Sequence, residues 1–345
     1  MKIKKCLSFD DVLLVPKMSE IVSRKEIDLS STLSFRYGKF SLPIISSPMD
    51  TVTETNMAIS MNKHGGLGVI HRYNTIEEQV NMCLSAQSKD SIVSAAIGVS
   101  GDYIDRATAL YESGVRILCI DIAHGHHKLM RNALSSLRGI FQSKVHIMAG
   151  NVATREGYED LVLWGADSVR VGIGGGSICS TRIQTGHGVP TFQSILDCSK
   201  SDYAGTYPII ADGGIKNSGD IVKAIAAGAD FVMLGSLLSG TEESPGGKIS
   251  RGGNLYKEYR GMASKRAQMN WRGRVASQEG VAAMVPYKGH AGEILGSLEA
   301  GIRSGLSYSG CVDIQSFQIS AEMINQTSAG IVESNTHVYS GGEKI

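Results

Sequence analysis

One cysteine of this sequence stands apart because glycine and small polar residues surround it. The stretch VGIGGGSICSTRIQTGHG runs from Val171 to Gly188 and holds Cys179 and, two residues later, Thr181. Its glycines free the backbone to adopt positive φ and to turn carbonyl oxygens inward, where they could hold a cation. A thiol beside a hydroxyl can be a nucleophile next to a proton-transfer group. The alternative is an ordinary small residue in a flexible connection, and the fold has to decide between the two.

The other cysteines and the clustered histidines give no comparable signal. Cysteines at 6, 83, 119, 198 and 311 lie far apart without a CxxC pair, which predicts neither a zinc site nor a disulfide framework. In apolar or helical segments they are expected to be small buried side chains. Histidines at 124, 126 and 127 could imitate a metal site, but a second group of ligands is missing, so we predict no metal there.

Two short glycine motifs and two aspartates could hold a nucleotide. The motifs ADGG and LGS supply glycines where a phosphate can approach the main chain, and Ser177 and Ser236 could add hydroxyl donors. Asp212 could accept hydrogen bonds from the two hydroxyls of a ribose, or it could be an exposed aspartate at a strand end. Asp121 has a similar choice between a ligand contact and a helix cap.

Eight short apolar runs, separated by amphipathic stretches, can bring these groups together. Runs of this length, bounded by Gly, Asp or Pro, are typical of buried parallel strands. Eight βα units favour a single (β/α)8 TIM barrel over an open doubly wound sheet, and barrel active sites lie on the loops after the strands. The runs span 43–48, 66–71, 91–98, 116–121, 145–150, 167–172, 208–214 and 230–236.

We predict one catalytic domain over residues 1–345, with a cysteine loop at about 172–188 and a mobile flap at about 240–285. The flap prediction rests on a turn-rich segment, 240–254, and a polar, basic segment, 261–280. A long polar loop of a barrel is often a lid, and the alternative is an irregular surface loop.

Composition bounds the partners of the chain. Its 345 residues are 42% hydrophobic with a net charge of +1, so no electrostatic footprint for nucleic acid or for an anionic membrane is present. No run approaches 18 apolar residues and the N-terminal stretch lacks a signal core. We therefore expect a cytoplasmic protein with a small-molecule ligand and no membrane or nucleic-acid partner.

Nine motifs, in this order, resemble those of the IMP dehydrogenase and GMP reductase family over nearly the whole chain. The resemblance implies a barrel that usually forms homotetramers and binds GMP or IMP by its phosphate, with a nicotinamide cofactor above the purine. It also implies a covalent bond from the loop cysteine to purine C2. The motifs are LSFDDVLLVP, PMDTVTE, HGGLGVIHR, IDIAHGHH, AGNVATREG, VRVGIGGGSICSTR, PIIADGGIKNSGDIVKAIAAGADFVMLGS, LYKEYRGMAS and EGVAAMVPYKG.

Carried over by position, the resemblance makes Cys179 the nucleophile and gives Thr181 and Glu279 the proton transfers. It implies a potassium-type site from the carbonyls of Gly174, Gly176 and Cys179, and cofactor contacts from Asp121, Asn151 and Arg170. The implied substrate contacts are Met49, Ser177, Asp212, Gly213, Gly214, Gly235, Ser236, Tyr259, Gly261 and Met262.

The two activities of the family share a covalent intermediate but form and resolve it by different reactions. The dehydrogenase passes hydride from IMP to NAD and then hydrolyses the thioimidate to XMP, using a flap with an Arg-Tyr pair to activate water. The reductase releases ammonia from GMP and then delivers hydride from NADPH to give IMP. Segment 261–280 has no Arg-Tyr dipeptide, no regulatory (CBS) domain is inserted after Thr75, and Thr185-Gly186 matches the reductase.

Other features resemble the dehydrogenase, among them PMDTVTE, SAAIGVSGD, Val281, Arg72 in place of a reductase lysine, and the tail AGIVESNTHV. Because water activation is a step that the dehydrogenase cannot omit, we expect an NADPH-dependent GMP reductase. One alternative is an IMP dehydrogenase that uses NAD and an arginine of residues 266–274. Another is a catalytically silent barrel that binds purine nucleotides.

Overall fold

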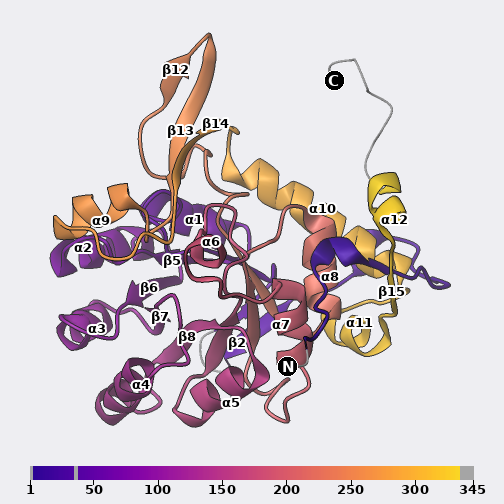
Figure 1. Cartoon of the computed structure of the whole chain (residues 1–345), viewed down its shortest axis with the longest axis horizontal. Helices are drawn as coiled ribbons and strands as arrows, with labels where there is room; N and C mark the ends of the chain where they lie inside the picture. The colour runs from indigo at the N-terminus through magenta and orange to yellow at the C-terminus, as the bar shows by residue number, and fades with distance from the viewer. Residues whose placement is uncertain (1–2, 35–37, 335–345) are drawn as a thin grey trace.

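The computed structural model describes residues 3–34 and 38–334, and its centre is a closed barrel of eight parallel strands (Figure 1). The order around the barrel is β10-β11-β4-β5-β6-β7-β8-β9. This confirms the predicted TIM barrel, and each of the eight apolar runs overlaps one strand. The strands are β4 (Ile44–Ser46), β5 (Leu67–Ile70), β6 (Val93–Ile97), β7 (Ile117–Asp121), β8 (His146–Val152), β9 (Ser168–Val171), β10 (Ile209–Asp212) and β11 (Phe231–Leu234).

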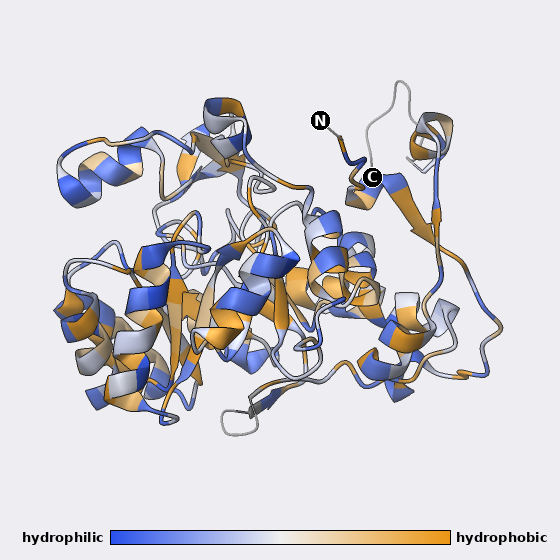
Figure 2. Ribbon diagram, turned by 60° about the horizontal axis from the view of Figure 1, so that its bottom comes forward, coloured by the Kyte–Doolittle hydropathy of each residue, from blue (hydrophilic) through white to orange (hydrophobic). Residues whose placement is uncertain are grey.

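The strands form because their side chains are buried on both faces. Inward-pointing residues such as Met148 and Phe231 fill the barrel, and outward-pointing residues pack against the helices. Leu33 and Phe40, from the hairpin of β2 (Ser31–Ser34) and β3 (Gly38–Phe40), join the inner cluster. Figure 2 shows the hydrophobic strands enclosed by helices whose outer faces are hydrophilic.

Helices cover the barrel, and polar side chains fix where several of them begin. The threonines at 75 and 154 and Asn217 each accept a backbone N–H in the first turn of the helix that follows. Because these caps follow barrel strands closely, the loops after β5, β8 and β10 are short. The helices of the barrel are α1 (Thr55–Lys63), α2 (Ile76–Gln87), α3 (Tyr103–Glu112), α4 (Lys128–Phe141), α5 (Arg155–Leu163), α6 (Thr181–Thr185), α7 (Thr191–Cys198), α8 (Ser218–Ala226) and α10 (Ala291–Tyr308).

The predicted flap segment is more regular than its composition indicates. It forms an antiparallel sheet of β12 (Ile249–Arg251), β13 (Asn254–Arg260) and β14 (Ala282–Pro286), with α9 (Lys265–Arg272) between the last two strands. Ser264 caps α9, and Gly273 ends it with a φ of 65°. Glycine and charge obscured these elements in the sequence, since the strands are half-exposed and carry polar side chains.

The ends of the described chain meet beside the barrel, where β1 (Val12–Leu14) pairs with β15 (Met323–Asn325). The remaining elements are η1 (Phe9–Asp11), η2 (Arg24–Glu26), α11 (Ile314–Ser320) and α12 (Ser328–Glu333). Between α2 and β6 there are only five residues, so no domain is inserted there. No helix in the described ranges has the length and apolar character needed to cross a bilayer. Part of the tail motif, residues 335–338, lies outside the described residues.

Candidate active site

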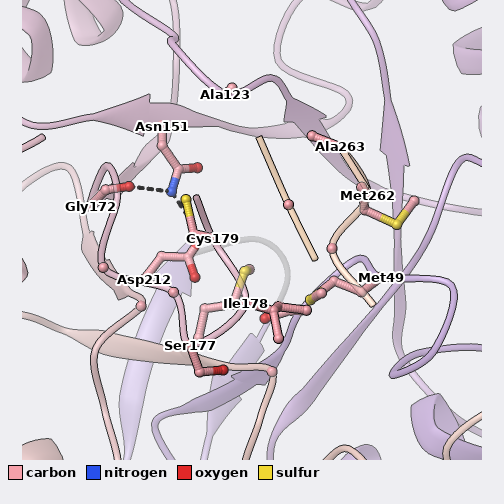
Figure 3. Close-up of a pocket in the computed structure, with 18 of the residues that line it drawn as sticks. Met49, Ala123, Asn151, Gly172, Ser177, Ile178, Cys179, Asp212, Met262 and Ala263 are labelled. Atoms are coloured by element: carbon pink, nitrogen blue, oxygen red, sulfur yellow. Dashed lines mark hydrogen bonds between the residues drawn. The ribbon is translucent and has the colours of Figure 1, made fainter. Parts of the chain in front are cut away.

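Every site residue predicted from the sequence lines one cavity of about 410 Å³ at the carboxyl ends of the barrel strands. The lining comes from the loops after β4, β5 and β7 to β11 and from both ends of the flap. Figure 3 shows Cys179, Asn151 and Asp212 around one side of this opening and Met49 and Met262 around the other.

Three side chains form a hydrogen-bonded relay in the cavity. The Cys179 thiol donates to the Thr181 hydroxyl at 3.2 Å, and that hydroxyl donates to Glu279 Oε2 at 2.9 Å. The second oxygen of Glu279, Oε1, accepts from Ser277 at 3.1 Å. A carboxylate joined through a hydroxyl to a thiol can take the thiol proton and return it to a leaving group.

Backbone pairing places Glu279 beside Cys179, which lies 100 positions earlier in the chain. Ser180 N donates to Glu279 O at 2.9 Å, and Val281 N donates to Ile178 O at 3.0 Å. These two bonds flank an antiparallel bridge between Cys179 and Gly280. The flap therefore completes the relay by adding one short extended segment to the cysteine loop.

A buried arginine links the two aspartates whose roles the sequence left open. Arg170, 5% exposed, donates to Asp121 Oδ1 at 2.7 Å and to Asp212 Oδ2 at 2.9 Å. Burial opposes the charge of Arg170, but Cys119 and the two aspartates raise the pKa of its guanidinium well above the ordinary value. Asn151 Nδ2 also donates to Asp212 Oδ2, at 2.9 Å. Asp121 is thus not a helix cap, and Asp212 is held with Oδ1 available to a ligand.

The part of the cavity next to Asp212 has the features of a phosphate and ribose pocket. Gly213 and Gly214 have φ values of 92° and 82°, which favour glycine. A Cβ on Gly235 would lie 2.9 Å from the Tyr259 hydroxyl, so this position has no room for a side chain. Burial raises the pKa of Tyr259 to about 12, and Ser177 is its hydrogen-bond partner. The phenol stays neutral and can donate a hydrogen bond at neutral pH.

Unpartnered polar atoms in the same cavity fit the polar end of a second ligand. Arg72 Nε, Asn151 Oδ1 and Arg170 Nε are buried without a hydrogen-bond partner in the protein. Two donors and one acceptor in a half-apolar cavity match a carboxamide, which carries both kinds of group. The residues present therefore fit a nicotinamide ring held beside the nucleotide site.

Four of the other five cysteines are buried, as their apolar or helical segments predict. Cys83, Cys119, Cys198 and Cys311 are buried thiols, and Cys6 is half-buried. Burial raises the pKa of Cys83 and Cys198 to about 12 and that of Cys119 to about 11, so none of the three is a thiolate at neutral pH.

The histidine turn has no metal-binding geometry. His126 Nε2 lies 2.7 Å from Asp160 Oδ2, and His127 Nδ1 accepts from Leu129 N at the start of α4. Among residues 3–34 and 38–334 no cluster of His, Cys, Asp and Glu could hold a metal ion. The predicted potassium site depends on backbone carbonyls instead and stays a prediction.

Sequence reasoning missed several residues of the site. Ser277, Arg72 and Tyr73 all have roles at the cavity or the relay, yet only Arg72 stood in a family motif. None of the flap arginines considered for water activation lines the cavity, and Arg266 instead pairs with Glu258 at 3.3 Å. The sequence has two Arg-Tyr dipeptides and neither is in the flap: Arg72-Tyr73 lines this cavity, and Arg36-Tyr37 lies outside the described residues.

A family model described as "IMP dehydrogenase / GMP reductase domain" matches residues 6–337. The chain is 38% identical to an inosine-5'-monophosphate dehydrogenase of Cryptosporidium parvum, with 97% of this chain and 96% of the relative covered. It is 31% identical to a GMP reductase of Leishmania major, with 96% of each covered. A solved GMP reductase variant of Trypanosoma brucei in complex with guanosine 5'-monophosphate superposes with a TM-score of 0.91, at 31% identity, over 97% of this chain and 98% of that one.

The lengths of these alignments show that an inserted domain is not a criterion for telling the reductase from the dehydrogenase. The alignment to the Leishmania major reductase extends over 475 residues and that to the Cryptosporidium parvum dehydrogenase over 388, against the 345 residues of this chain. The longer alignment belongs to the reductase. The absence of an inserted domain therefore does not distinguish the two activities.

Proposed function

The chain belongs to the IMP dehydrogenase / GMP reductase family, and on this premise we propose that it is a GMP reductase that converts GMP and NADPH to IMP, NADP and ammonia. The observation that carries the proposal is the relay from Cys179 through Thr181 to Glu279. This relay can supply the proton that a departing amino group needs. The flap that completes it brings no Arg-Tyr pair for activating water.

In the first half-reaction Cys179 loses its proton through Thr181 to Glu279 and forms a bond to C2 of GMP. As the thiolate adds to C2, the π electron pair of the C=N double bond at C2 moves to the ring nitrogen. The relay then returns the proton to the amino group, the C2–NH2 bond breaks, and ammonia leaves a thioimidate on Cys179. Atoms and charge balance, since the proton taken from the thiol departs with the ammonia.

In the second half-reaction the C2–S bond breaks and the Cys179 thiolate is restored, ready to take up a proton. NADPH, when bound, supplies the hydride that C2 receives in place of the sulfur. Asn151, Arg170 and Arg72 would hold its nicotinamide end through the unpartnered atoms described above. The protein's task in this step is to keep C2 beside that ring and to exclude water, which would otherwise hydrolyse the thioimidate.

The nucleotide would be oriented by Asp212 and by the glycine loops after β10 and β11. Asp212 Oδ1 accepts from the ribose hydroxyls, while Gly214, Gly235 and Ser236 approach the phosphate and Tyr259 donates to it. Met49 and Met262 lie against the base, where Met262 Sδ also accepts from Asp50 N at 3.3 Å. We further propose a cytoplasmic homotetramer with a potassium ion on the carbonyls of Gly174, Gly176 and Cys179.

The second candidate function is an IMP dehydrogenase, and the Arg72-Tyr73 pair is the observation that favours it. Arg72 and Tyr73 line the cavity, and Arg72 donates to Asp121 O at 3.1 Å, so the site does include a guanidinium beside a tyrosine. A catalytically silent nucleotide-binding barrel is disfavoured because it would have no use for the complete relay.

Two parallel assays test the proposal. Purified protein is mixed with GMP and NADPH, or with IMP and NAD, and the nicotinamide absorbance is followed, with Cys179→Ala as the matched control. We expect absorbance to fall in the first mixture only, and only with the cysteine present. Appearance of NADH and XMP in the second mixture, with no reaction in the first, would assign the dehydrogenase instead.

A further inference from the structure

The flap helix α9 contacts the barrel through an aromatic side chain, Trp271. Of its eight residues, Ala267 and Gln268 are buried and Trp271 is half-buried, while the other five are exposed. The Trp271 ring stacks on the Tyr73 ring with centroids 5.7 Å apart and planes 15° from parallel. Figure 1 shows α9 beside α2, which begins three residues after Tyr73.

The surface that receives Trp271 is rigid. Arg106, 1% exposed, uses all five of its N–H groups on Asp102, Gln79 and both the side chain and carbonyl of Asn74. These bonds fix the segment that carries Tyr73, and they hold the guanidinium carbon 5.9 Å from the centroid of the Trp271 ring. A guanidinium and a tyrosine ring, both held in place, form a docking surface for one indole.

The flap connects this docking point to the catalytic relay through Gln268, one turn before Trp271. Gln268 is 4% exposed, and its Nε2 donates to Ala263 O at 2.9 Å and to Ser277 O at 2.8 Å. Its Oε1 accepts from Ala276 N at 2.9 Å. Ser277 in turn donates to Glu279 Oε1. A continuous set of contacts therefore joins Trp271 to the carboxylate that the relay needs.

We infer that Trp271 is a positioning residue, which docks the flap on Tyr73 and Arg106 and thereby holds Glu279 against Thr181. The inference deepens the proposed function, since it takes Glu279 as the proton carrier. The docked flap also covers Tyr73 through the Trp271 ring, and burial raises the pKa of the Tyr73 phenol. When Trp271 leaves its surface, the segment 276–279 loses its anchor and the relay opens at the Thr181–Glu279 bond.

Kinetics test this inference with variants of one helix. An aromatic stack and a cation–π contact together change the ratio of docked to undocked flap on the order of a hundredfold, equivalent to about 2.8 kcal/mol, so their loss turns a flap docked about 10:1 into one undocked about 10:1. Trp271→Ala should lower kcat about tenfold and leave the Kd of the nucleotide within twofold. Trp271→Phe should restore most of the rate, and Met269→Ala, an exposed change on the same helix, should have no effect. A Trp271→Ala enzyme within twofold of the parent kcat would overturn the inference.

A double variant tests whether Trp271 acts through Glu279. In a Glu279→Gln background, Trp271→Ala should reduce the remaining rate no further, because the carboxylate to be positioned is absent. A further tenfold loss in that background would show that Trp271 acts on something else and would contradict the inference. Both measurements use the nucleotide and cofactor that the protein turns over, so a dehydrogenase result would refute the proposed function while leaving this comparison intact.

Fluorescence gives a readout that needs no turnover. The chain has two tryptophans, so Trp164→Phe leaves Trp271 as the only indole. Removing its stacking partner with Tyr73→Ser should shift the Trp271 emission to longer wavelength, as the ring enters water. An unchanged emission spectrum would mean that the ring is not docked on Tyr73 in solution, and the inference would fail whatever reaction the protein catalyses.

Discussion

The buried arginine beneath the site allows a quantitative prediction. Arg170 is 5% exposed and forms ion pairs with both Asp121 and Asp212, with N–O distances of 2.7 and 2.9 Å. Replacing it by methionine keeps a similar length and removes the charge, which leaves two carboxylates close together with little access to water. The energetic cost arises mainly from the uncompensated carboxylates rather than from lost packing.

The expected size follows from buried ion pairs in general. Removing one partner of such a pair costs about 3–5 kcal/mol. With an unfolding entropy of about 2 cal/mol/K per residue, a loss of about 4 kcal/mol lowers the Tm of a chain of this length by about 5 °C. Arg155→Met is the matched control, because Arg155 pairs with Glu159 on the surface at 46% exposure and such pairs contribute at most about 1 kcal/mol.

Thermal unfolding of four proteins measures the effect: the parent, Arg170→Met, Asp121→Asn and the double variant. Because Asp121→Asn removes one of the two carboxylates, Arg170→Met should cost less in that background than in the parent. The nucleotide KM should also rise in Arg170→Met, since Asp212 loses one of its two anchors. A Tm within 1 °C of the parent, or strictly additive effects, would refute the assignment of Arg170 as the link between the aspartates.

Three further predictions concern the site and the core. Cys179→Ala should abolish turnover and leave nucleotide binding measurable by calorimetry, and a variant that kept most of its rate would remove Cys179 from the mechanism. Glu279→Gln should lower kcat by about 10²-fold or more with little change in nucleotide Kd, as expected for a lost proton carrier, and normal turnover would contradict this. Burial lowers the pKa of His146, which is 1% exposed, to about 4. Because this folded-state pKa lies below the ordinary 6.5, the contribution of His146 is fully present above pH 6.5 and is lost as pH falls toward 4. His146→Gln should therefore reduce the loss of unfolding free energy between pH 6.5 and 4 by about 3 kcal/mol, measured by urea titrations at both pH values, and an equal loss in the two proteins would contradict the assignment.

The barrel could be predicted from the sequence because its strands are buried on both faces. Runs such as 91–98 and 116–121 are continuous and apolar, and their Gly, Asp and Pro boundaries coincide with the ends of β6 and β7. The flap lacked such a signal. Its strands β13 and β14 are stabilised by pairing with each other while one face stays in water. Their residues are therefore polar enough to resemble those of a loop in the sequence.

The sequence predicted which residues line the site but not which of them contact one another. Family motifs and the barrel rule identified Cys179, Thr181 and Glu279, and all three line one cavity. The bridging role of Arg170 depends on the order of strands β7, β8, β9 and β10 around the barrel, which no local pattern encodes. The stack of Trp271 on Tyr73 joins residues almost 200 positions apart, and no spacing in the sequence predicts it.

The central claim is that this cavity carries out the reductive deamination of GMP. The most direct measurement is the product balance of one reaction with GMP and NADPH, in which ammonia, IMP and NADP are quantified together. We expect one mole of ammonia, one of IMP and one of NADP for every mole of NADPH consumed. Absence of ammonia and IMP with GMP, together with XMP and NADH from IMP and NAD, would contradict it.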